Sequence, residues 1–199
     1  RLPELLSVAK KFNLKIISIE DLIAYRMKHD TLIQKIDETT LNVMNSSFKL
    51  HVFGQINSDK IHFAITHGFW KKNNPVLTRM ISTKSINRSV NSIHNQNDLE
   101  LNKCINSIIK EKSGSIIFVN QSNESSIILE NLSKIVDTEI KKPLSSAKNN
   151  KMDSKDFGIG AQILESLDIT KIKLLTNSNK VKRIGLSGYG LEIIGRVKY

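Results

Sequence analysis

The chain has 199 residues and a formal net charge of +11, because 30 residues are Lys or Arg and 19 are Asp or Glu. The basic residues are spread along the whole chain and only 6% of residues are aromatic, which argues against a nucleic-acid interface. A single cysteine excludes a disulfide framework and a zinc site of several cysteines. No apolar run has the length of a membrane span, so we expect no membrane partner and a cytoplasmic location.

The N-terminal residues predict a helix, a strand and a second helix. Apolar residues recur at helical spacing after Pro3, which suits the first turn of a helix. Residues 15–19 predict the strand, and residues 20–28 predict the second helix. The stretch 31–47 is polar with scattered apolar residues, and we interpret it as a junction between two parts of the protein.

The middle of the chain alternates between strand and helix patterns. The predicted strands are 48–53, 60–65, 76–81 and 115–119, and the predicted helices are 98–112 and 127–135. A hairpin turn at 57–59 joins the first two strands. Cys104 falls on the apolar side of the first of these helices, where a buried, inert thiol is expected. His51, His62, His67 and His94 lack the short paired spacing of metal ligands and are interpreted as ordinary polar residues.

The last third of the chain predicts a helix, a strand and a glycine-containing loop. Ser154 is the predicted cap of the helix, whose apolar side carries Ile159, Ile163 and Leu167. Residues 172–175 predict the strand that follows. Such an order of helix, strand and loop occurs in many unrelated folds and by itself indicates no function.

Three strings in this third closely resemble GTP cyclohydrolase II, the enzyme that opens the imidazole ring of GTP in riboflavin synthesis. They are D-x-x-D-F-G-I-G-A-Q-I-L from Asp153, K-I-K-L-L-T-N from Lys171 and G-L-x-G-Y-G-L-E from Gly185. Near the N-terminus, R-L-P-E-L and D-L-I-A-Y-R are similar to the last segment of 3,4-dihydroxy-2-butanone 4-phosphate synthase. In many bacteria that synthase is fused in front of GTP cyclohydrolase II.

The resemblance implies an α/β (α+β) fold of the GTP cyclohydrolase II type, a mixed β-sheet with flanking helices, and a domain division. The chain begins with Arg1 and not with methionine, so we expect it to be the C-terminal part of a bifunctional riboflavin protein. Residues 1–30 would be the tail of the synthase, 31–47 the junction and 48–199 the GTP cyclohydrolase II-like domain. The family also implies a homodimer.

The family's metal chemistry requires residues that this chain lacks at the matching positions. GTP cyclohydrolase II uses zinc, held by three cysteines, and magnesium. By resemblance the three zinc positions are Lys84, Asn95 and Asn97. A lysine ammonium repels a dication, and one cysteine cannot supply three thiolates. We therefore expect no metal cofactor.

The substrate-binding positions are only partly retained. The family's phosphate loop, R-Q-E-G-R-G-I-G, corresponds here to residues 120–126, where Gln121 is kept and Glu124 replaces an arginine. A carboxylate facing a triphosphate reverses the sign of the interaction. The catalytic positions by resemblance are Asp153 and Lys155. The GTP-binding positions by resemblance are Arg79, Ser82, Thr138, Thr176 and Lys182.

These observations favour a domain that does not catalyse ring opening and that supports the folding, dimerisation or regulation of the fused synthase. GTP or another nucleotide would bind weakly, and the retained polar residues would be vestigial. Two alternatives remain open. The domain could still open GTP, with release of formate and pyrophosphate, through other metal ligands such as Asp153, His94 and Asp98. It could also be a basic nucleic-acid-binding module.

Overall fold

The computed structural model describes residues 2–19, 21–22, 25, 29–56, 58–122, 124–136, 140, 157–178 and 190–199. Its strands form one seven-stranded sheet in the order β1-β2-β3-β5-β4-β6-β7. The strands are β1 Ile33–Val43, β2 Ser46–Gln55, β3 Ile61–His67, β4 Pro75–Thr83, β5 Gly114–Asn120, β6 Lys171–Leu175 and β7 Glu192–Val197. The helices are α1 Leu2–Phe12, α3 Ile86–Asn95, α4 Leu99–Glu111, α5 Ser125–Val136 and α6 Phe157–Ser166.

The sheet is mixed, which confirms the predicted α/β class. Along the sheet, neighbouring strands pair antiparallel from β1 through β2 and β3 to β5. They pair parallel from β5 through β4 and β6 to β7. The four predicted strands and two predicted helices of the middle of the chain are all present, as are the predicted helix and strand that follow it. Within the described part of the chain, no helix combines the length and apolar character needed to cross a membrane.

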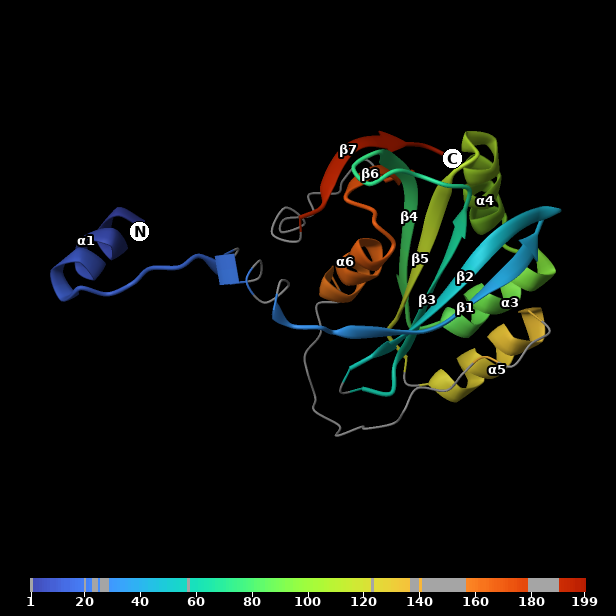
Figure 1. Ribbon diagram of the computed structural model, residues 1–199, viewed down its shortest axis with the longest axis horizontal. Coiled ribbons are helices and arrows are strands. Elements are labelled where there is room, and N and C mark those ends of the chain that lie inside the picture. The colour runs from blue at the N-terminus through green and yellow to red at the C-terminus, as the bar shows by residue number, and fades with distance from the viewer. Residues whose placement is uncertain are drawn as a thin grey trace.

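Two apolar layers hold the helices against the sheet. Figure 1 shows α6 on one side of the sheet and α3, α4 and α5 on the other. The layer under α3, α4 and α5 contains Phe63 and Phe118, whose rings stack with centroids 4.4 Å apart. The layer under α6 contains Ile117 and Ile163. Because β5 is covered on both faces, all seven of its residues are buried.

Several elements differ from the sequence prediction. The interpretation of 31–47 as a junction is wrong for most of its length, because β1 lies in this stretch and pairs with β2 along its whole length. The predicted strand 15–19 is absent, since this segment lies outside the sheet and has no neighbouring strand to bond. The predicted helix 20–28 falls largely outside the described residues. The sequence prediction also missed α3 and β7.

The described residues 2–19 of the N-terminal arm project away from the sheet (Figure 1). Its helix α1 carries apolar side chains that are more than half exposed: Leu2, Leu5, Leu6 and Phe12. Of the residues of α1, only Ala9 is buried. An amphipathic helix with an uncovered apolar side is typical of a segment that packs against another folded part.

Gly68 follows β3 at a position that requires glycine. Its φ of +72° is left-handed, and a Cβ there would lie 2.0 Å from the backbone oxygen of Lys112. We expect Gly68→Ala to lower the free energy of unfolding by about 3 kcal/mol, as measured by urea denaturation. Gly195→Ala is the matched control, because nothing lies within 4 Å of its added Cβ. Equal losses for both variants would contradict this account of Gly68.

Candidate functional site

The carboxyl ends of β4 and β5 bring two of the predicted site residues together. The two strands are parallel and end side by side, with Thr83 opposite Asn120. Gln121 donates its side-chain N–H to Ser82 Oγ at 2.8 Å and its backbone N–H to the oxygen of Thr83 at 2.9 Å. This edge of a parallel sheet is where α/β proteins commonly bind ligands. Here, Ser82 and Gln121 hold the two strand ends to each other.

The loop that corresponds to the family's phosphate loop is bonded largely to itself. Asn120 Oδ1 accepts hydrogen bonds from both the backbone N–H and the hydroxyl of Ser122, at 2.7 and 2.9 Å. Glu124 Oε2 accepts a 2.9 Å bond from the side-chain amide of Asn87, at the start of α3. A phosphate nest needs backbone N–H groups that point outward. The described donors and carboxylate of this loop instead stabilise the loop and its contact with α3.

His62 organises the same loop from beneath, a role that the sequence prediction missed. Its Nδ1 accepts the backbone N–H of Asn120 at 3.0 Å, so Nε2 carries the proton toward Gln55 Oε1, 3.2 Å away. The side chain is fully buried, and this burial lowers its pKa to about 3. Only tertiary structure could assign this role, because the loop lies 58 residues further along the chain.

Arg79 is not brought together with Ser82. By strand alternation Arg79 lies on the sheet face of Leu77, whereas Ser82 lies on the face of Met80. Arg79 Nη1 donates to the backbone oxygen of Leu175 at 3.2 Å, and its guanidinium carbon lies 5.2 Å from the centroid of the Tyr199 ring. These contacts fix the C-terminal residues to the sheet.

Cys104 lies near Arg79 and Tyr199, on the inner side of α4. Only 1% of its surface is exposed, which confirms the predicted burial. Burial raises the pKa of the thiol to about 11, so the reactive thiolate is suppressed. Cys104 is therefore a core residue and offers no ligand to a metal.

Thr176 is buried just after β6. It donates its backbone N–H to the oxygen of Val197 at 2.8 Å, and its Oγ1 accepts the N–H of Ser178 at 3.2 Å. Thr176 therefore shapes the turn that leaves β6. The other predicted positions lie outside the described residues: Thr138, Asp153, Lys155 and Lys182.

The three positions that the resemblance assigns to zinc lie at or beyond the two ends of α3. Lys84 lies just before α3, and Asn95 is the last residue of that ten-residue helix. At 1.5 Å per residue the helix separates these two positions by about 15 Å, far more than two ligands of one ion allow. A lysine and two carboxamides are also poor zinc ligands, so the residues present do not fit the metal. Among the described residues, no group of three His, Cys, Asp or Glu side chains could hold a metal ion.

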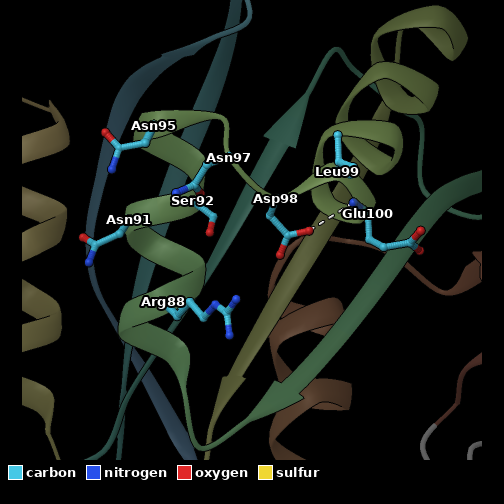
Figure 2. A pocket seen from close by; sticks show the side chains of 8 residues that line it. All are labelled: Arg88, Asn91, Ser92, Asn95, Asn97, Asp98, Leu99 and Glu100. Carbon is cyan, nitrogen blue, oxygen red and sulfur yellow. Dashed lines mark hydrogen bonds between the residues drawn. The ribbon is translucent and has the colours of Figure 1, made fainter.

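A cavity of about 780 Å³ lies beside the end of α3. Its lining residues are Arg88, Asn91, Ser92, Asn95, Asn97, Asp98, Leu99 and Glu100. Figure 2 shows Asn91 and Asn95 projecting from one side of α3 and Arg88 from the other, so these side chains do not converge. Asp98 caps α4, since its Oδ1 accepts the backbone N–H groups of Glu100 and Leu101 at 3.0 and 3.1 Å. The cavity thus has a polar lining whose side chains point in different directions.

Comparison with protein-family models identifies the family of the chain. The model described as GTP cyclohydrolase II matches residues 34–198. The match begins within β1, inside the stretch that the sequence suggested was a junction.

Comparison with curated proteins gives several relatives that share one name with each other. A "Riboflavin biosynthesis protein RibBA" from Cytophaga hutchinsonii is 38% identical over 97% of this chain and 48% of its own length. The RibBA proteins of Porphyromonas gingivalis and Aquifex aeolicus are 38% and 35% identical over 99% of this chain and 49% of their own length. The chain therefore spans about half the length of the curated relatives it matches.

Among solved structures, the chain is similar to "RibBX, a two domain 3,4-dihydroxy-2-butanone 4-phosphate synthase from A. baumannii". The TM-score is 0.49 at 22% sequence identity, and the similarity covers all of this chain and 49% of that one.

Proposed function

Because the chain belongs to the GTP cyclohydrolase II family, we propose that it is a domain of a riboflavin biosynthesis protein that no longer opens GTP and supports a synthase fused to it. In this proposal the partners of the domain are the synthase and a second copy of the chain. GTP or another nucleotide binds weakly, if it binds at all, and the longer protein is cytoplasmic.

The observation that carries the proposal is the separation of the zinc positions. Ring opening in the family depends on a zinc ion that activates water. Lys84 and Asn95 stand at opposite ends of α3, and the one cysteine of the chain is buried in α4. Substitution at three ligand positions and the loss of their common location both argue against a zinc-bound water in this domain.

The loop after β5 supports the same conclusion independently of the metal. Glu124 places a carboxylate where the family has an arginine, and that carboxylate is engaged by Asn87. Asn120 uses its side chain to bond Ser122 within the loop. A triphosphate would have to displace these bonds and would meet a negative charge.

The N-terminal arm supports the second half of the proposal. The exposed apolar side chains of α1 need a cover that the described part of this chain does not supply. The curated relatives are about twice as long as this chain, so each has additional polypeptide. We propose that residues 1–30 belong to a synthase domain whose remainder covers α1.

Deletion of the domain from the longer protein tests this proposal. Removing residues 33–199, so that β1 is removed with the rest of its sheet, is expected to lower synthase activity several-fold and to reduce its oligomeric order. A several-fold loss of activity is expected because removing about 1–2 kcal/mol of stabilisation changes the amount of folded protein several-fold. Synthase turnover and light scattering are the measurements.

Asp153→Ala is the matched control for the deletion. It changes a family catalytic position and leaves the sheet in place, so full synthase activity is expected. A deleted protein with wild-type activity, stability and oligomeric state would contradict the supporting role.

A further inference from the structure

Gln162, on α6, makes two hydrogen bonds to the backbone of the segment that connects the N-terminal arm to β1. Its Oε1 accepts the backbone N–H of Leu32 at 2.7 Å, and its Nε2 donates to the backbone oxygen of Asp30, also at 2.7 Å. The side chain of Gln162 is 7% exposed. The two bonded segments are 130 residues apart in the chain, so neither bond could be inferred from local sequence.

The pair of bonds has the pattern of a parallel β-ladder. In such a ladder a residue faces a neighbour on the adjacent strand. It donates its N–H to the C=O of the residue before that neighbour, and its C=O accepts the N–H of the residue after it. Gln162 does the same with its carboxamide, bonding the C=O of residue 30 and the N–H of residue 32. The oxygen of Leu32 itself accepts the backbone N–H of Ile56 at 2.8 Å. Leu32 is therefore bonded through both its N–H and its C=O.

The surroundings of Gln162 fix its position. α6 packs into the apolar layer through Ile159 and Ile163, on either side of Gln162 in the sequence. Beside the two bonds lies a cavity of about 320 Å³ whose walls include Thr31, Lys35 and Glu165. A buried amide on a well-packed helix is pre-organised, so it loses little entropy when it bonds the segment.

Upstream of Asp30 the described backbone bonds are local. The N–H of Leu14 donates to the oxygen of Ala9, and that of Leu22 donates to the oxygen of Ser18. Figure 1 shows that α1 lies far from the sheet. The bonds at Asp30 and Leu32 therefore stand at the point where the arm leaves the domain.

We infer that Gln162 anchors residues 30–32 to α6 and thereby sets the direction in which the N-terminal arm leaves the sheet. This role goes beyond support of a synthase, because it applies to whatever precedes residue 30. Whether the domain is catalytic has no bearing on it.

Gln162→Asn tests the role in the chain as it stands. Asparagine keeps the amide but is one methylene shorter, so it cannot reach both backbone groups. We expect hydrogen exchange at the Leu32 amide to become about tenfold faster. Exchange at Ile117, in the centre of the sheet, is expected to stay unchanged. Glu165→Gln is the control, since Glu165 is exposed and borders the same cavity.

A distance measurement separates an effect on the direction of the arm from an effect on local packing at Leu32. Spin labels at Ser7→Cys in α1 and Asn106→Cys in α4 report the position of the arm, because both sites are exposed and Cys104 is buried. With Gln162→Asn the distribution of distances between the labels is expected to broaden or shift, and with Glu165→Gln to stay as in the parent.

Two results would overturn the inference. An unchanged distance distribution would show that the two bonds do not direct the arm. Equally accelerated exchange at Ile117 and Leu32 would show that Gln162 stabilises the domain as a whole.

Discussion

The purified chain is expected to release no formate from GTP, with or without added zinc. The reason is that the positions assigned to zinc by resemblance are substituted and separated by α3. Glu124, bonded by Asn87, also stands where the family's phosphate loop has an arginine. Formate release measured over hours against a boiled sample checks this expectation. Turnover above the boiled control would refute the proposal that the domain is not catalytic.

Restoring the cysteines is expected to leave the chain inactive. The variant Lys84→Cys, Asn95→Cys, Asn97→Cys supplies three thiols, but α3 keeps the first about 15 Å from the second. We expect less than one zinc per chain by metal analysis and no formate. Tight zinc binding at one ion per chain would show that the end of α3 rearranges, and that the helix is no barrier to the metal.

The folded chain is expected to lose stability steeply as the pH falls from 7 to 5. Burial lowers the pKa of His62 to about 3 and is also the main cause that lowers the pKa of His51 to about 4. In the unfolded chain both groups titrate near pH 6.5. Between pH 6.5 and 5 the two histidines therefore bind protons in the unfolded chain but stay neutral in the folded chain. The loss is about 1.4 kcal/mol per pH unit for each histidine, or about 4 kcal/mol for both over this range.

The neighbours of His51 modify this effect without reversing it. Lys35 and Lys49 also lower its pKa, whereas Glu38 raises it. His51 Nδ1 lies 3.1 Å from Glu38 Oε2, and its Nε2 is bonded to Thr66 Oγ1 at 2.9 Å. A bond from Lys35 is the main cause that lowers the pKa of Glu38 to about 2. That carboxylate adds to acid destabilisation only below about pH 4.5, outside the range considered.

Urea unfolding at pH 7, 6 and 5 measures the predicted loss. His62→Asn removes one of the two titrating groups, so the change in unfolding free energy between pH 7 and 5 is expected to fall by about half. His94→Asn serves as the control, because His94 is exposed at the end of α3. A pH dependence that is the same in all three proteins would mean that other groups govern acid unfolding.

The sequence alone determined the class of the fold and most of its elements. Alternating strands such as 60–65 and the helical apolar spacing of α6 are local signals, since each depends on residues a few positions apart. The family could also be recognised from short strings around Asp153 and Lys171. That the chain cannot supply three thiolates to a zinc ion needed only the count of cysteines.

Some elements were missed although their signals were present. Ile86, Val90 and Ile93 recur at helical spacing in α3, which is a local signal of a helix. β1 was hidden because it is an edge strand, and edge strands carry polar and charged residues that resemble a linker.

Only the tertiary structure decided what the site residues do. Arg79, a GTP-binding position by resemblance, bonds Leu175 and contacts the Tyr199 ring, and His62 accepts the N–H of Asn120. Gln162 bonds a segment 130 residues away. Each role depends on which strands lie side by side and on which face a side chain points. A sheet of seven strands fixes both through pairings between distant parts of the chain, and such pairings leave no periodic signal in the sequence.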